Sequence, residues 1–96
     1  MKVSYVVTYD ICNPKRLRAV FNLMKGYGEH LQYSVFRCDL SDMGRAKLKG
    51  ELVQVLDMRV DQVMFIDLGP ADGRAAVAIE TIGRGWIPEA RGAVIV

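Results

Sequence analysis

The sequence is organised around residues 3–11, which are Val3-Ser4-Tyr5-Val6-Val7-Thr8-Tyr9-Asp10-Ile11. β-Branched and aromatic residues dominate this stretch, and their preference for a pleated, buried surface predicts a β-strand. Asn13 and Pro14 follow; Asn is a good helix cap and Pro suits the first helical position, so a helix is expected to begin there. The predicted order is strand, carboxylate, helix. Asp10 therefore lies at a strand end beside a helix N-terminus, where α/β proteins tend to place their chemistry.

The composition is that of a small globular protein. The chain has 96 residues, which allows one domain, and it is 51% hydrophobic and 25% charged, which argues against disorder. No apolar stretch approaches the roughly 20 residues that span a membrane, and the first residues lack the pattern of a signal peptide. We therefore expect a cytoplasmic protein with no membrane partner, forming one domain over residues 1–96 with its core in about residues 1–82.

Cysteine and histidine usage excludes the usual structural zinc sites. Cys12 and Cys38 form no C-x-x-C pair, and His30 is the only histidine. We expect two reduced, partly buried thiols. We also expect His30, which directly follows Gly28-Glu29, to be a loop residue and not a ligand or base.

The net charge of +2 conceals an asymmetry between the two halves of the chain. Residues 1–50 carry nine Lys or Arg and four acids, whereas residues 51–96 carry four basic residues and seven acids. A basic half favours a polyanionic partner such as a phosphate backbone, although a solvated face explains the charge equally well. Arg16 and Arg18 lie near the start of the predicted first helix, where the helix dipole mildly disfavours cations. Their placement makes more sense with an anion nearby.

The remaining elements follow from periodicity and turn residues. The first helix has an apolar stripe at i, i+3, i+4 and i+7, formed by Leu17, Val20, Phe21 and Met24. Residues 31–40 predict an extended run with a bend or bulge near Ser34, and Ser41 is a candidate cap for a second helix. Further strands are predicted at residues 62–68, 75–80 and 93–96. The last of these must pair with a sheet edge, its own or a partner's, and exchange with a second protomer would lock a dimer.

Four segments, in this order and at this spacing, resemble one known family. They are Tyr9-Asp10-Ile11, Lys15-Arg16-Leu17-Arg18, Leu31-Gln32-Tyr33-Ser34-Val35-Phe36, and Asp61 leading an apolar strand that ends at Leu68. Together they are similar to the CRISPR-associated endonucleases of the Cas-two family, which accompany the Cas-one integrase in acquiring new spacers. Arg37 departs from the family pattern, because an acid usually stands at this position.

The resemblance implies a ferredoxin-like α+β sandwich, with two helices on one face of a mainly antiparallel sheet, and a homodimer. It implies that Asp10 of each protomer shares a divalent metal, Mg²⁺ or Mn²⁺, for phosphodiester hydrolysis in RNA or double-stranded DNA. Tyr9 is then the second catalytic residue, flanking the carboxylate. The implied nucleic-acid-binding residues are Arg16, Arg18, Arg37, Ser34 and Phe36.

Several alternatives stay open at the level of sequence. One Asp10 alone cannot build a Mg²⁺ site, because the ion takes six oxygen ligands, although several are usually water. Asp10 could instead accept hydrogen bonds from backbone N–H groups at the following helix, and Ser34 and Phe36 could serve packing and strand register. The whole protein could be a non-catalytic, DNA-binding scaffold of the spacer-integration complex. A more distant alternative is a ferredoxin-like regulatory module that binds a small ligand.

Overall fold

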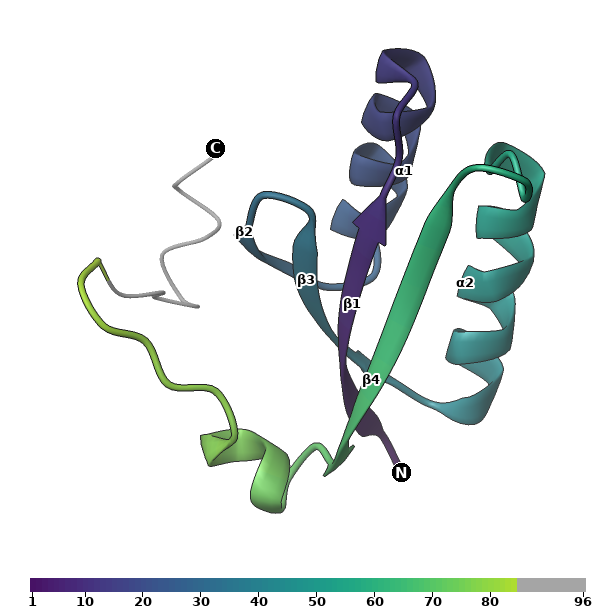
Figure 1. Ribbon diagram of the computed structural model, residues 1–96. Helices are drawn as coiled ribbons and strands as arrows, with labels where there is room; N and C mark the ends of the chain where they lie inside the picture. Colours follow the sequence, from purple (N-terminus) through teal and green to yellow (C-terminus); the bar gives the residue numbers. More distant parts are fainter. Residues whose placement is uncertain (85–96) are drawn as a thin grey trace.

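The computed structural model describes residues 1–84 as one sheet with two long helices (Figure 1). The elements in chain order are β1 (Val3–Asp10), α1 (Pro14–Lys25), β2 (Glu29–Gln32), β3 (Val35–Leu40), α2 (Asp42–Val55), β4 (Gln62–Pro70) and the short 3₁₀ helix η1 (Arg74–Val77). The strand order is β2-β3-β1-β4, and each neighbouring pair is antiparallel. This topology confirms the predicted ferredoxin-like α+β fold.

Both helices begin at the capping residues that the sequence indicates. The Asn13 side chain accepts hydrogen bonds from the backbone N–H groups of Lys15 and Arg16, and Pro14 occupies the first helical position. At α2, Ser41 Oγ accepts a hydrogen bond from the Gly44 N–H at 3.0 Å. These caps satisfy N–H groups that have no partner inside the helix, and so fix where each helix starts.

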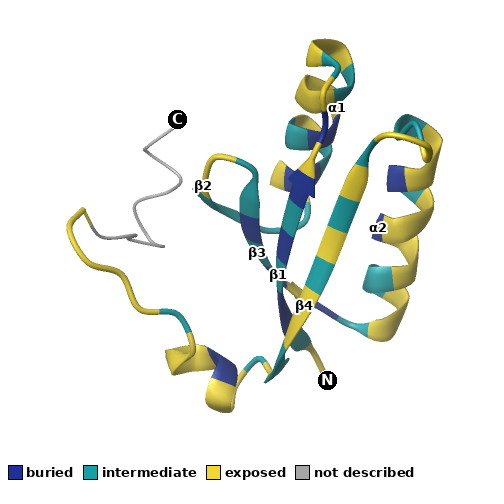
Figure 2. Cartoon of the chain, viewed as in Figure 1, coloured by how far each residue is buried: buried dark blue, intermediate teal, exposed yellow. Residues whose placement is uncertain are grey.

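The hydrophobic core lies between the sheet and the two helices, and β1 and β3 both carry buried residues (Figure 2). Alternate residues of each strand point to the core. The core residues are Tyr5, Val7 and Tyr9 of β1, Phe36, Cys38 and Leu40 of β3, Val20 and Met24 of α1, and Leu48 and Leu52 of α2. Both helices therefore cover the same face. The opposite, helix-free face of the sheet carries neither α1 nor α2.

The extended run at residues 31–40 is a hairpin, with the turn at Tyr33 and Ser34 between β2 and β3. The bend predicted near Ser34 is confirmed, and it supplies the hairpin that the ferredoxin-like topology requires. The prediction that His30 is a loop residue was wrong, because it lies in β2. Its ring packs against the rings of Phe21 and Phe36, with centroids 5.0 Å away in both cases. These aromatic contacts stabilise His30 in β2, although the local sequence has only a weak preference for a strand.

The strand predicted at residues 75–80 was also wrong. Residues 74–77 form η1, and an irregular segment follows up to residue 84. Residues 75–80 contain three alanines, which favour helical turns over strands, and Ala75 is buried. The strand predicted at residues 93–96 lies outside the described residues. Among residues 1–84, no helix has both the length and the apolar character that crossing a membrane requires.

Gly28, which follows α1, and Gly50, inside α2, differ in the space around them, so substitution of each by alanine tests the packing. A Cβ on Gly28 would overlap the Arg37 carbonyl oxygen and lie 2.5 Å from Cys38 Sγ, whereas a Cβ on Gly50 has no neighbour within 4 Å. We expect Gly28→Ala to lower the free energy of unfolding by about 2–3 kcal/mol through overpacking. Gly50→Ala, inside α2, should raise it by about 0.5–1 kcal/mol. Urea unfolding of both variants checks this; equal stability of Gly28→Ala and the unmodified protein would contradict it.

Candidate functional site

Asp10 is the last residue of β1, and its side chain is exposed. Because side chains alternate along a strand, Asp10 points to the helix-free face while Tyr9 points to the core. Within residues 1–84, its carboxylate makes no hydrogen bond or ion pair. Asn13, and not Asp10, caps the following helix. Asp10 therefore does not accept hydrogen bonds from the backbone N–H groups of the following helix, and its carboxylate is available to a ligand.

Tyr9 is buried and stacks on Phe36, with ring centroids 6.3 Å apart and an angle of 26° between the rings. Burial raises the pKa of the Tyr9 phenol, and a hydrogen bond from the Ser34 side chain acts in the opposite direction. The phenol therefore keeps its proton at neutral pH and is not a general base. The Tyr9 N–H also donates to the Ser34 carbonyl at 3.1 Å. These contacts fix the strand end that presents Asp10.

Arg16 forms a bidentate ion pair with Asp61, whose side chain is fully buried. Nε donates to Oδ2 at 2.7 Å and Nη2 to Oδ1 at 3.1 Å. Asp61 also accepts hydrogen bonds from the backbone N–H groups of Asp57 and Cys12, so it joins the β1–α1 junction to the α2–β4 connection. The hydrogen bond from Arg16 lowers the pKa of the Asp61 carboxyl. Apart from the position of Asp61 before a strand, no sequence pattern indicated this pairing.

The Arg16–Asp61 pair predicts an acid-dependent loss of stability. The pKa of Asp61 is lower in the folded state than in the unfolded state, where it is about 3.9. The contribution of the Asp61 carboxylate to the free energy of unfolding is therefore complete above the unfolded-state pKa and is lost as the pH falls through the folded-state pKa. We expect Asp61→Asn to lower the melting temperature at pH 7 by about 5–10 °C and to narrow the difference between pH 7 and pH 3. Thermal unfolding at both pH values measures this, with the exposed Asp72→Asn as the control. An Asp61→Asn protein that melts like the unmodified protein at pH 7 would contradict the assignment.

The two other predicted arginines lie in different environments. Arg37, in β3, is 12% exposed; Nη2 donates to Ser4 Oγ at 3.3 Å and Nε lies 3.8 Å from Asp39 Oδ1. Ser4 Oγ also donates to Asp39. Arg18 is exposed on α1 and has no hydrogen-bond or ion-pair partner within residues 1–84. Of the three arginines, Arg18 alone can reach a phosphate without giving up an ion pair within the described residues.

The structure places the two remaining candidate residues differently. Phe36 is fully buried among Tyr9, Phe21 and His30, an environment that fits the packing alternative. Ser34 is partly buried in the β2–β3 turn, beside Tyr9. The structure thus brings Ser34, Phe36 and Tyr9 together beneath the end of β1, while Asp10 and Arg18 are the exposed members of the set.

The donor set suits a hard cation but is incomplete in one chain. Among the described residues, no three His, Cys, Asp or Glu side chains are grouped so that they could hold a metal ion. An exposed, unpaired carboxylate is the kind of ligand that Mg²⁺ prefers, but Asp10 supplies only one such group. The residues therefore fit half of a magnesium site.

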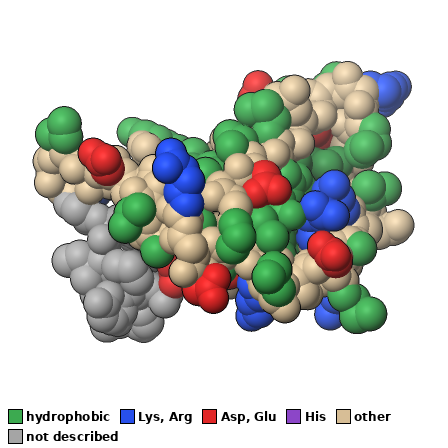
Figure 3. All heavy atoms as spheres, turned by 90° about the horizontal axis from the view of Figure 1, so that it is seen from below, with side chains coloured by type: hydrophobic (Ala, Val, Ile, Leu, Met, Phe, Trp, Pro, Cys, Tyr) green, Lys and Arg blue, Asp and Glu red, His purple; other side chains and the backbone are tan. Residues whose placement is uncertain are grey.

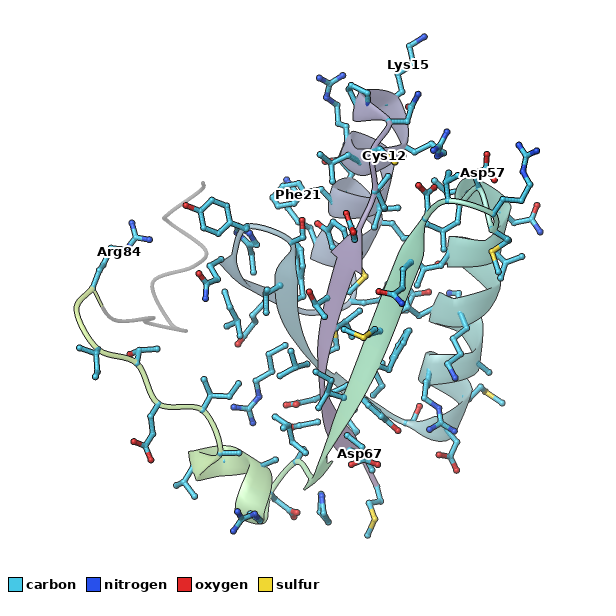
Figure 4. The ribbon with its side chains drawn as sticks, viewed as in Figure 1. Cys12, Lys15, Phe21, Asp57, Asp67 and Arg84 are labelled. Carbon is cyan, nitrogen blue, oxygen red and sulfur yellow. The ribbon has the colours of Figure 1, made fainter. Side chains whose placement is uncertain are left out.

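The cysteines add no ligand to this half-site. Both thiols are free; Cys38 is buried, whereas Cys12 is exposed and not partly buried as predicted. Burial raises the pKa of Cys38 to about 12, so the thiol stays protonated. Cys12 lies at the same end of the sheet as Asp57, and Asp67 lies at the opposite end (Figure 4). Viewed from the end of the sheet where β1 begins, acidic and basic side chains are interspersed among hydrophobic ones, with no patch of one sign (Figure 3).

The sheet order and the unpaired acid at the end of β1 define a small ferredoxin-like protein with a carboxylate half-site at a strand end. Residues 1–74 match the family described as CRISPR associated protein Cas2. The chain therefore belongs to the Cas2 family, as the sequence motifs indicate.

Known relatives cover nearly the whole chain. The CRISPR-associated endoribonuclease Cas2 1 of Rhodospirillum rubrum is 42% identical over 97% of this chain and 90% of its own length. The CRISPR-associated endoribonuclease Cas2 of Geobacter sulfurreducens is 38% identical over the full length of both chains. The crystal structure of Streptococcus pyogenes Cas2 at pH 6.5 superimposes with a TM-score of 0.71 at 34% identity, covering 83% of this chain and 99% of that one. The relatives from Rhodospirillum rubrum and Geobacter sulfurreducens are both named endoribonucleases.

Proposed function

We propose that the protein is a metal-dependent endonuclease that hydrolyses phosphodiester bonds in RNA or double-stranded DNA during the acquisition of CRISPR spacers. The observation that carries the proposal is the exposed Asp10 carboxylate, which has no partner within residues 1–84. Relatives at 42% and 38% identity that are named endoribonucleases support the reaction class. A protein with this task would work in the cytoplasm, beside the Cas-one integrase.

The active form in this proposal is a homodimer. On the helix-free face, Val6 pairs with Ile66 and Thr8 with Met64, and the side chains of Met64 and Ile66 are 47% and 46% exposed. An apolar strip in the middle of a sheet face is an unfavourable surface in water, and a second copy would cover it. The same face carries Asp10, so pairing two copies supplies the second carboxylate.

In the mechanism, Asp10 of each protomer would hold Mg²⁺ or Mn²⁺ as a pair of carboxylate ligands. When bound, the metal supplies positive charge that stabilises the charge developing on the phosphoryl oxygens. Arg18 binds a neighbouring phosphate through its unpaired guanidinium. Tyr9 holds the end of β1 against the core, and the Arg16–Asp61 pair fixes the β1–α1 junction that follows Asp10.

The activity is tested with rigorously purified protein and labelled RNA and duplex DNA. We expect cleavage in Mg²⁺ or Mn²⁺ of at least one of these substrates, and none in excess EDTA. Cleavage that is equal with and without the chelator would contradict a metal-dependent nuclease.

A non-catalytic scaffold that grips duplex DNA is the second candidate, favoured by the unpaired, exposed Arg18 on α1. We expect Arg18→Glu to weaken duplex binding about tenfold or more and to reduce the salt dependence of the affinity. Filter binding across a salt series measures both, with Arg74→Glu, exposed on η1, as the charge-matched control. Equal effects of the two reversals would show that only net charge matters and would exclude a specific contact by α1. The scaffold also predicts that Asp10→Ala leaves spacer integration intact.

A further inference from the structure

Tyr33, in the turn between β2 and β3, combines exposure with an unusual backbone. Its side chain is 88% exposed, and its φ of 38° is the only positive value at a non-glycine residue within residues 1–84. The left-handed region is unfavourable for a residue with a bulky side chain, and glycine or asparagine is the usual choice there. The Tyr33 ring contributes little to the core, because it buries almost no surface.

The backbone of the β2–β3 turn makes contacts with the core, whereas the Tyr33 ring is exposed. His30 Nε2 lies 2.7 Å from the Tyr33 carbonyl oxygen, and the His30 ring packs against Phe21 and Phe36. On the other side of the turn, the Ser34 carbonyl accepts a hydrogen bond from the Tyr9 N–H at 3.1 Å. The backbone of Tyr33 is therefore anchored to the core on both sides, and its ring projects into solvent from a fixed base.

The register places this ring at the same end of the sheet as Asp10. Thr8 pairs with Val35, and the Tyr9 N–H bonds to Ser34, so the next residues along the two segments are Asp10 and Tyr33. The exposed carboxylate and the exposed aromatic ring therefore lie at the same end of the sheet. No other exposed aromatic side chain lies within residues 1–84.

We propose that Tyr33 stacks on an unpaired nucleobase at the end of the sheet that carries Asp10. This subsite rests on the proposed nuclease function, which it deepens by favouring single-stranded chains. Exposed tyrosine rings stack on bases that are free of a partner, and the interaction tolerates any base sequence because every base has a flat face. A duplex offers no free face to such a ring, since its bases are already stacked.

The test uses two variants, Tyr33→Asn and Tyr33→Phe, and measures binding in EDTA so that cleavage plays no part. Asparagine tolerates the left-handed backbone and removes the ring, whereas phenylalanine keeps the ring and removes the hydroxyl. The probes are single-stranded RNA, single-stranded DNA and duplex DNA, the single strands carrying the fluorescent base 2-aminopurine. We expect Tyr33→Asn to weaken both single strands by roughly tenfold and to leave duplex affinity unchanged, with Tyr33→Phe within about twofold throughout.

Three results would overturn the subsite: unchanged single-strand affinity in Tyr33→Asn, equal loss for single strands and duplex, or a loss that follows a weakened dimer in sedimentation. Loss on RNA alone, shared by Tyr33→Phe, would assign the hydroxyl to the ribose and also reject stacking. Failure of the nuclease proposal is a separate outcome. It would appear as metal-independent cleavage or as no cleavage, whatever the binding data for Tyr33.

Discussion

Asp10→Asn is expected to slow cleavage of RNA or DNA at least about 100-fold, because the amide cannot supply the anionic oxygen that a divalent cation requires. The carboxylate has no partner within residues 1–84, so the substitution should leave the melting temperature unchanged. Single-turnover cleavage with saturating Mg²⁺ measures the rate, and the same preparations serve for thermal unfolding.

Asp67→Asn is the matched control for this experiment. Asp67 is also an exposed residue, on β4, which pairs with β1, but it lies at the opposite end of the sheet (Figure 4). It should retain the full cleavage rate. An Asp10→Asn protein that cleaves as fast as Asp67→Asn would remove Asp10 from the chemistry and leave the scaffold as the better account of the protein.

Phe36→Ala is expected to lower the free energy of unfolding by about 3–5 kcal/mol, the usual cost of removing a large aromatic side chain from a core. Phe36 is fully buried, and its ring contacts Tyr9, Phe21 and His30. Its loss leaves a cavity beneath both the end of β1 and the β2–β3 turn. Urea unfolding monitored by circular dichroism measures the change.

The same substitution separates the two roles that the sequence left open for Phe36. Phe36→Leu keeps most of the volume and should cost less than about 1.5 kcal/mol, with nucleic-acid affinity preserved. If Phe36→Ala were instead nearly as stable as the unmodified protein but bound nucleic acid much more weakly, a direct contact would be the better explanation. We expect any loss of affinity in Phe36→Ala to follow the loss of folded protein.

Local signals in the sequence were sufficient to predict the main elements of the fold. The β-branched run of β1 and the caps Asn13 and Ser41 each act over a few residues, and the structure has them as predicted. Of the apolar stripe predicted for α1, Val20 and Met24 are buried and Phe21 is partly buried, whereas Leu17 is exposed. Ser34 was recognised as a bend because the alternation of apolar residues changes there. The error at His30 arose because aromatic packing holds it in a strand that the local sequence does not indicate. The error at residues 75–80 arose because their alanine content favours a helical turn over a strand.

The site was less predictable because its contacts join residues that are distant in sequence. Arg16 and Asp61 are 45 positions apart, and only the folded chain shows that the guanidinium is already paired. Arg37 is similarly held by Ser4 and Asp39, while Arg18 is free of such contacts within residues 1–84. For Asp10, the second carboxylate in our proposal belongs to another copy of the chain, so the contacts within one chain do not include it.

The most direct test of a shared Asp10 site is the stoichiometry of Mn²⁺ binding, measured by electron paramagnetic resonance on the purified protein. We predict one tightly bound ion per two chains, lost in Asp10→Asn and retained in Asp67→Asn. One ion per chain, or binding that survives Asp10→Asn, would contradict a metal site shared between the two Asp10 carboxylates.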